Sequence, residues 1–250
     1  MRCLGRPLPG MLVLETEPRC DQRGFFARVF CRHELRDLGA EPMVEQANLS
    51  YSERRGTLRG LHYQLGPSAE TKIVTCARGA IHDVVLDLRR SSPTFGRWAA
   101  VELSAENGRL VVVPEGCAHG FLTLADDSLA FYLVSSPYDP VRERGVRWDD
   151  PAFGVVWPFR PAVISDRDAA HPDFDPGYHL AACWGSTRRP HPGPLRPLAR
   201  QERESRAPPS RDERGNVLRP AHHRAEPAPD ARPPHRRLLL HRRLVRAGAA

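Results

Sequence analysis

The most marked shortage in this 250-residue sequence is lysine: of its 37 basic residues, Lys72 alone is not an arginine. Arginine serves well on a solvated surface, whereas lysine directs a compact ammonium at a single oxygen. Lys72 lies ten residues after His62, close to the densest polar cluster of the chain, Arg59–Gln64. A leftover surface lysine is the alternative interpretation. The neighbourhood favours a chemical role.

The sequence also lacks the patterns of small zinc domains and of membrane proteins. Its six cysteines form no CxxC pair and show no zinc-ligand spacing. No stretch approaches the 18 apolar residues of a membrane-spanning helix, and Met1–Leu14 lacks the apolar core of a signal peptide. We therefore expect no membrane partner and a reducing, cytoplasmic location.

Aromatic residues are missing from the C-terminal part of the chain after Trp184. Residues 181–250 hold 16 arginines, 6 acidic residues and 11 of the 25 prolines. Such a segment buries too little apolar surface to offset its ordering entropy. The composition predicts a folded domain over 1–176 and a disordered Arg/Pro-rich tail over 177–250. The pI of 9.5 for the whole chain results from the excess of arginine in this tail. It therefore does not indicate nucleic-acid binding by the folded domain. A basic arm on nucleic acid and a translation artefact of a GC-rich frame remain as alternatives for the tail.

What the first 180 residues do contain is a series of short apolar segments separated by Gly, Pro, Asn and Asp. These segments predict strands, and their close spacing without long interleaved helices indicates an all-β sandwich or barrel. One short helix is expected over 32–38, and 151–174 is expected to be an irregular wrap with a helical turn. The predicted strands are Met11–Leu14, Phe25–Phe30, Met43–Leu49, Thr57–Gln64, Lys72–Ala77, Ala80–Leu88, Trp98–Leu103, Arg109–Val113, His119–Leu124 and Leu129–Ser135.

A longer pattern, G-x5-P-x-G-x2-H, runs from Gly108 to His119. It resembles the second of the two motifs that mark cupin jelly-roll barrels, in which the histidine points into the barrel mouth. A structural histidine that caps a strand is the alternative. Most cupins with this motif bind a metal, and imidazoles with a carboxylate are the ligands that Fe, Mn or Zn require. Here His62 lacks the partner imidazole two residues on.

Two further residues bear on the metal question. Glu70 is a possible carboxylate ligand but lies in an expected loop, and His82 could face the same cavity as His62. We expect no metal and no cofactor. A metal-dependent cupin oxygenase or isomerase stays open as an alternative function.

Several further segments carry a more specific resemblance, which spans about residues 10–174. Together they resemble the dTDP-4-dehydrorhamnose 3,5-epimerase family, metal-free cupins that act on sugar nucleotides. The resemblance implies inversion of C3 and C5 of a dTDP-4-keto-6-deoxyhexose in deoxysugar biosynthesis. A mono-epimerase on a related substrate and a non-catalytic sugar-nucleotide-binding cupin are the alternatives. The segments are Gly56–Gln64, Lys72, Ser92–Gly96, Val113–Phe121, Tyr132, Ser136–Pro140, Glu143 and Trp148–Pro151.

Epimerisation beside a ketone requires a base, a group that stabilises the enolate and an acid across the ring. The resemblance assigns the base to His62, with its tautomer fixed by Asp168, although Asp166 is close by. Lys72 fits the enolate stabiliser, and Tyr132 fits the opposing acid. A sheet aromatic is the alternative for Tyr132.

The resemblance also implies a nucleotide-binding set. Tyr138 is expected to stack on the base or frame the sugar pocket, or else to cover the barrel as a loop aromatic, and Glu143 and Arg167 are expected to line the site. The residues expected to contact the diphosphate or nucleoside are Arg23, Gln46, Asn48, Arg59 and His119.

The N-terminal segment bears on both assembly and selectivity. Dimers of the family exchange N-terminal strands, so we expect a homodimer in which the segment Arg23–Phe30 reaches the neighbouring subunit's site. After Arg23–Phe26 the family usually carries a glutamate that bonds the thymine edge, whereas this chain has Ala27–Arg28. Because arginine accepts no hydrogen bond, a relaxed nucleotide preference is consistent with the change.

Overall fold

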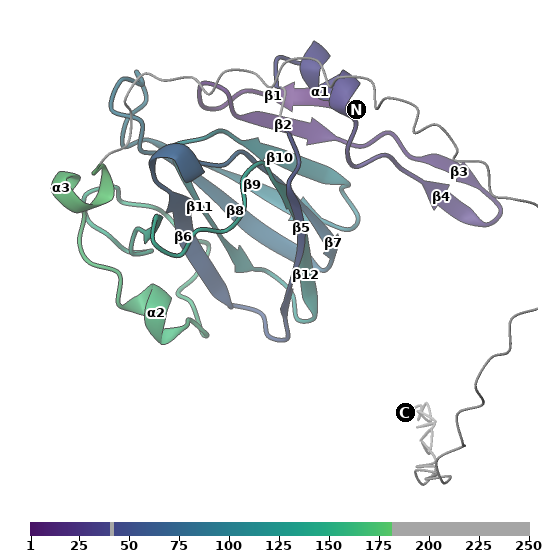
Figure 1. The fold of residues 1–250 in the computed structure, drawn as a ribbon. Coiled ribbons are helices and arrows are strands. Elements are labelled where there is room, and N and C mark those ends of the chain that lie inside the picture. The colour runs from purple at the N-terminus through teal and green to yellow at the C-terminus, as the bar shows by residue number, and fades with distance from the viewer. Residues whose placement is uncertain (41–42, 182–250) are drawn as a thin grey trace, which may run out of the picture. The chain divides into compact units, whose positions relative to one another are not determined.

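The computed structural model describes residues 1–40 and 43–181, in which two antiparallel sheets pack face to face (Figure 1). The first sheet has the order β1-β2-β10-β7-β12-β5 and the second the order β13-β6-β11-β8-β9, while β3 and β4 form a separate hairpin. The all-β expectation is confirmed. The strands are β1 Arg2–Gly5, β2 Leu12–Glu15, β3 Arg19–Asp21, β4 Gly24–Phe26, β5 Gln46–Ser52, β6 Leu58–Gln64, β7 Lys72–Arg78, β8 Ala80–Asp87, β9 Trp98–Ser104, β10 Arg109–Val113, β11 Cys117–Thr123, β12 Ser128–Val134 and β13 Glu143–Gly145.

The helices are short and lie outside the sheets (Figure 1). They are α1 Arg32–Asp37, α2 Asp166–Ala169, α3 Pro176–His179 and a 3-10 helix over Gly66–Ser68. The expected helix corresponds to α1, which buries Leu35, and the expected helical turn in the wrap corresponds to α2. Sequence reasoning missed β1, β3 and β13, each of which has only three or four residues.

Strand residues alternate between the inner and outer faces of the two sheets, and part of each outer face is also covered by other segments. Residues such as Val74, Val85 and Phe121 form the core between the sheets. The outer face of the first sheet packs against α1 and its flanking residues, through Leu35, Phe30 and Leu38. The outer face of the second sheet is covered by the segment that follows β13, through Val146 and Phe153 among others. The inner core is therefore shared by the two sheets, and polar side chains on the same inner faces border it.

The packed body continues past residue 176, where the sequence predicted its end. Tyr63 donates a hydrogen bond from its hydroxyl to the carbonyl of His179 (2.8 Å), and both His179 and Leu180 are buried. Residues 177–180 therefore pack with the barrel instead of beginning a tail. The rest of the expected tail, from residue 182 on, lies outside the described residues. Among the described residues no helix has the length and apolar character needed to cross a membrane.

Candidate active site

A β-bulge in β6 determines which of its side chains face the inside of the barrel. His62 lies opposite His119 on β11, but Arg59 lies opposite Phe121, so β6 contains one extra residue between the two pairs. Because of this extra residue, Arg59 and His62 share one face although they are three positions apart. Gly60 at the bulge has φ +113°, and a Cβ there would lie 2.6 Å from Gly120 Cα. Only glycine fits this close approach of the two strands.

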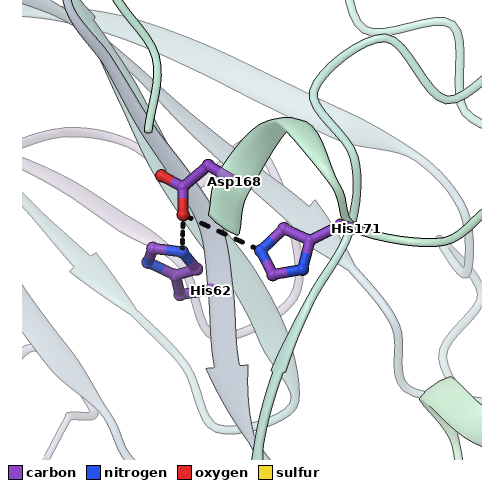
Figure 2. Close-up of side chains that lie close together, drawn as sticks. All are labelled: His62, Asp168 and His171. Carbon is purple, nitrogen blue, oxygen red and sulfur yellow. Dashed lines mark hydrogen bonds and ion pairs between the residues drawn. The ribbon is translucent and has the colours of Figure 1, made fainter. Parts of the chain in front are cut away.

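His62 and Asp168 form a hydrogen-bonded pair between β6 and α2 (Figure 2). His62 Nε2 lies 2.9 Å from Asp168 Oδ1, and the other carboxylate oxygen accepts a bond from the Gly60 amide (3.0 Å). Ser165 caps α2 by accepting a hydrogen bond from the Asp168 amide at 3.1 Å. The neighbouring Asp166 is exposed. The structure therefore brings Asp168, the aspartate expected from the resemblance, into contact with His62.

The electrostatics of this pair fix the histidine tautomer. Burial alone would raise the pKa of Asp168, but the hydrogen bonds from His62 and Gly60 outweigh it and lower the pKa to about 2. The carboxylate is ionised at neutral pH and can only accept hydrogen bonds. A neutral His62 ring therefore carries its proton on Nε2, and its Nδ1 is left with a free lone pair. Such an arrangement suits a general base.

His171 is a third member of this cluster and was missed by sequence reasoning. Its Nε2 lies 3.8 Å from Asp168 Oδ1, and its ring meets the edge of the His62 ring with centroids 5.7 Å apart. Burial is the main cause that lowers the pKa of His171, with a contribution from the charge of His62. The only available signal was its position three residues after Asp168, one helical turn away. Among the described residues these three side chains form the one group with the spacing of a metal site.

Lys72 and Tyr132 lie on the facing sheet. Tyr132 on β12 pairs with Val74 on β7, and Val134 pairs with Lys72, so alternation places Lys72 and Tyr132 on the same face as the inner-core residue Val74. His62 belongs to the opposite sheet. The structure thus brings the imidazole and the phenol to opposite walls, with the ammonium on the wall of the phenol.

Both Lys72 and Tyr132 lie close to other charged side chains. Lys72 forms a buried ion pair with Glu70, whose other oxygen accepts a hydrogen bond from Gln64 (2.6 Å). Glu70 was considered from the sequence only as a metal ligand, and its pairing with Lys72 was not foreseen. Burial raises the pKa of Tyr132, while the charge of Arg59 acts in the opposite direction. The phenol is therefore protonated at neutral pH, next to a cation that favours its phenolate.

His119 and His82 lie on opposite faces of the second sheet. His119 is buried and its Nε2 lies 2.7 Å from Asp83 Oδ2, so a second histidine–carboxylate pair lies inside the barrel. His82 packs against Trp157 on the outer face, so the expectation that it could share the cavity of His62 is wrong. Alternation along β8 explains why His82 faces outward while the adjacent Asp83 faces inward toward His119. The same alternation could have identified Asp83.

A polar chain of three residues lies beside His62. Glu143 on β13 forms an ion pair with Arg167 and accepts a hydrogen bond from the Tyr138 hydroxyl (2.6 Å). Burial would raise the pKa of Glu143, but Arg167 and Tyr138 lower it, and the charge of His62 adds to this effect. Gln46 fixes the loop by accepting a hydrogen bond from the Tyr138 amide at 2.7 Å. These four predicted residues are therefore brought together.

The remaining predicted residues divide into two groups. Asn48 faces Tyr132 across β5 and β12, and the Arg59 guanidinium donates to the carbonyl of Tyr51 (2.8 Å), so both border the same inner space. Arg23 instead lies in the turn of the β3–β4 hairpin, highly exposed and paired with Asp21. It does not join the site of its own chain. Arg28 forms an ion pair with Glu34 at 2.6 Å, also outside the site.

Comparisons with known proteins show which family this chain resembles in sequence and fold. A family model described as dTDP-4-dehydrorhamnose 3,5-epimerase matches residues 6–176. The curated dTDP-4-dehydrorhamnose 3,5-epimerase of Sinorhizobium fredii is 46% identical over 155 residues, which are 62% of this chain and 80% of that protein. The crystal structure of the Bacillus anthracis enzyme of the same name, with TDP and PPi bound, gives a TM-score of 0.68 at 38% identity and covers 69% of this chain and 99% of that one.

A second solved structure belongs to a 3'-monoepimerase. The enzyme from Streptomyces bikiniensis, in complex with dTDP-quinovose, gives a TM-score of 0.66 at 37% identity. The match covers 73% of this chain and 92% of that one. The jelly-roll fold expected from the sequence is thus confirmed, and both double and single epimerases are similar to this chain.

Proposed function

The chain belongs to the dTDP-4-dehydrorhamnose 3,5-epimerase family, and on that premise we propose that it inverts C3 and C5 of a dTDP-4-keto-6-deoxyhexose. The observation that carries the proposal is the hydrogen-bonded pair of His62 and Asp168, opposite Tyr132 across the inner space of the barrel. A double epimerase needs one base and one acid on opposite faces of the sugar ring. Relatives whose names state this activity support the assignment.

His62 is proposed to remove the proton beside the C4 ketone. Its Nδ1 lone pair takes the proton, and the electrons of the C–H bond move into the enolate. The imidazolium that results is stabilised by ionised Asp168, which holds the ring through Nε2 at 2.9 Å. The same side chains then act on the second carbon, since both carbons lie beside the same carbonyl.

Lys72 and Tyr132 are proposed to complete the reaction. Lysine has three N–H donors, and Glu70 occupies one of them, so Lys72 retains donors for the enolate oxygen. Tyr132 donates its proton to carbon from the opposite face. The nearby charge of Arg59 favours the phenolate that is left behind. Solvent then returns a proton to Tyr132 and accepts the one on His62, so that the cycle closes without net change.

The nucleotide end of the substrate needs cations and a flat surface. Arg59 at the edge of the inner space is proposed to bind the diphosphate. Tyr138, which is largely exposed and anchored by Glu143, offers a stacking surface for the base. Gln46, Asn48, His119 and Arg167 are proposed to line the same space. The Bacillus anthracis enzyme, whose crystal structure holds TDP and PPi, supports this assignment.

We also propose a homodimer that exchanges N-terminal strands. Among the described strands, β3 and β4 pair only with each other, and the hairpin extends away from the two sheets (Figure 1). It carries two exposed aromatic side chains, Phe25 and Phe26, which a partner would bury. Such an exchange would bring Arg23 to the partner's site. Sedimentation velocity on the double variant F25S/F26S should show a monomer where the wild-type chain sediments as a dimer.

Deuterium exchange tests the chemistry. The protein is incubated with dTDP-4-keto-6-deoxyglucose in D2O, and label at C3 and C5 is followed by NMR. Label at both carbons is the expected result, whereas label at one carbon would instead assign the mono-epimerase activity of the Streptomyces bikiniensis relative. No label at either carbon would contradict an enzymatic role on this substrate and leave a sugar-nucleotide-binding cupin.

Two substitutions separate the proposed roles in the same assay. His62→Ala should abolish exchange because the base is lost. Tyr132→Phe should permit exchange but impair inversion, since the proton then lacks a donor on the opposite face. Tyr51→Phe is the matched control, because Tyr51 lies on the exposed outer side of β5. Inversion by Tyr132→Phe at the wild-type rate would assign the acid to another residue.

A further inference from the structure

Three donor atoms converge beside the inner space of the barrel (Figure 2). Asp168 Oδ1 lies 2.9 Å from His62 Nε2 and 3.8 Å from His171 Nε2, and the three side chains offer ligand atoms within 4.8 Å of one another. Two imidazole nitrogens and one carboxylate oxygen form a donor set that Zn²⁺ accepts readily.

His171 has no other evident partner for its Nε2. The side chain is 10% exposed, and this nitrogen is buried without a hydrogen-bond partner. Its ring lies directly over Gly145, where an added Cβ would be 2.0 Å from Nε2. A buried polar atom left unpaired costs about 1–3 kcal/mol. The absence of a side chain at Gly145 leaves room for the ring to turn this atom toward Asp168.

The cluster needs only small adjustments to hold an ion. Tetrahedral Zn²⁺ with ligands at about 2.0–2.1 Å places its donor atoms about 3.3 Å apart, between the two distances from Asp168 given above. The Gly60 amide fixes the second oxygen of Asp168 at 3.0 Å, as hydrogen bonds commonly do for metal-bound carboxylates. His62 is 31% exposed on its side chain, so solvent reaches the cluster and can fill a fourth position.

We propose that His62, Asp168 and His171 form a Zn²⁺ site that reversibly switches off the general base. Zinc bound at Nε2 of His62 displaces the proton from that nitrogen. A neutral imidazole bound to a metal through one nitrogen carries its proton on the other. The proton therefore moves to Nδ1, and the lone pair assigned to proton abstraction is lost. The binding site stands on the geometry alone, whereas the inhibition also rests on the proposed function.

The test compares zinc binding and inhibition in the full-length protein and its variants. Chelator-treated protein is titrated with Zn²⁺ against a chromophoric zinc indicator, and deuterium exchange is measured over the same range. Each variant is compared with its own rate in chelator. His171→Asn removes one ligand, and His33→Asn, at an exposed position of α1, is the matched control for zinc held by surface histidines.

The expected result is loss of one bound Zn²⁺ in His171→Asn. The Zn²⁺ concentration for half-inhibition should rise by about tenfold or more, since even an outer-shell partner is worth about 10–100-fold in metal affinity. His33→Asn should match the wild-type protein. Equal stoichiometry and equal inhibition in His171→Asn and wild type would overturn the proposal.

A second measurement requires no variant. A wild-type crystal soaked in Zn²⁺ at the inhibitory concentration should give an anomalous difference peak between the three side chains, and an empty position there would overturn the site. Together, the exchange assay and the crystal soak also separate the zinc site from the proposed function. A protein that binds Zn²⁺ at this position but never exchanges substrate protons retains the site and contradicts the proposed function. If zinc leaves the exchange of substrate protons unaffected and the position is empty, the zinc site is contradicted and the proposed function is retained.

Discussion

At the scale of single residues, partners decide what each side chain can do. A histidine in a strand is usually structural, but His62 is partly exposed to the inner space and held by an ionised carboxylate. Lys72 was expected to stabilise the enolate, and the structure pairs it with Glu70. Its charge is therefore partly neutralised before substrate arrives, and its contribution to the enolate comes from its remaining donors.

The Asp168→Asn substitution should reduce the rate of deuterium exchange by roughly 10²–10⁴-fold. An amide neither stabilises the imidazolium nor enforces the Nε2 tautomer, and loss of such a partner has effects of that size in comparable pairs. Asp166→Asn is the matched control two residues away and should change the rate by no more than about twofold, as exposed substitutions do. Equal losses in both variants would contradict the assignment of Asp168.

The same aspartate should make stability depend on acid pH. Its pKa in the folded protein is about 2, below the ordinary value, so its contribution is complete above the unfolded pKa and is lost as pH falls from about 4 toward 2. For this buried side chain the difference corresponds to on the order of 2 kcal/mol. Urea unfolding at pH 6 and pH 3 should therefore show a smaller acid-induced loss in Asp168→Asn than in the wild-type protein.

At the scale of elements, the bulge of β6 places two functional side chains on one face. In a regular strand Arg59 and His62 would point to opposite sides, because the side-chain period is two residues. The extra residue depends on the close approach of Gly60 and Gly120. The element therefore determines both the position of the base and that of the proposed diphosphate contact.

Gly60→Ala should destabilise the protein and impair activity together. The new Cβ would lie 2.6 Å from Gly120 Cα, at a φ of +113° that alanine rarely adopts. Backbone strain and overpacking each cost about 1–3 kcal/mol, which should appear as a lower urea midpoint. Gly5→Ala is the control, because nothing lies within 4 Å of its added Cβ. A Gly60→Ala protein as stable as Gly5→Ala would contradict this account.

At the scale of the whole molecule, the C-terminal segment of the packed body closes the outer face of the second sheet. Leu180 belongs to the same core cluster as Leu61 and Val84, and Tyr63 bonds to the His179 carbonyl. The composition of the sequence placed the end of the domain at residue 176. Leu180 was not recognised as a core residue, because the four-residue helix α3 is too short to show a periodic apolar pattern.

Truncation should locate the functional end of the chain. A chain that ends at Ala181 should keep its thermal midpoint and its exchange rate, because the composition after this residue predicts no packing. A chain that ends at Asp175 loses Leu180 and α3, and removal of a buried leucine alone costs about 2–5 kcal/mol. Calorimetry of both proteins checks this. Equal midpoints for the two truncations would show that α3 does not support the barrel.

The sequence by itself determined the longer strands and the segments proposed to carry the chemistry, because alternation and turn residues are local properties. The pattern from Gly108 to His119 indicated the cupin barrel, and the further segments around His62, Lys72 and Tyr132 carried the family resemblance from which the proposed roles were predicted. Long-range pairing was not readable in this way. Alternation alone could not predict that a bulge turns Arg59 to the face of His62.

Only the tertiary structure decided which groups meet. It placed the predicted Asp168, and not the neighbouring exposed Asp166, against His62 across 106 positions of the chain, and it turned His82 outward against Trp157. It also brought His171 to the carboxylate that the base already uses. The physical reason is that hydrogen bonds and burial across two sheets and a wrapping segment depend on distances in space, which no local sequence pattern records.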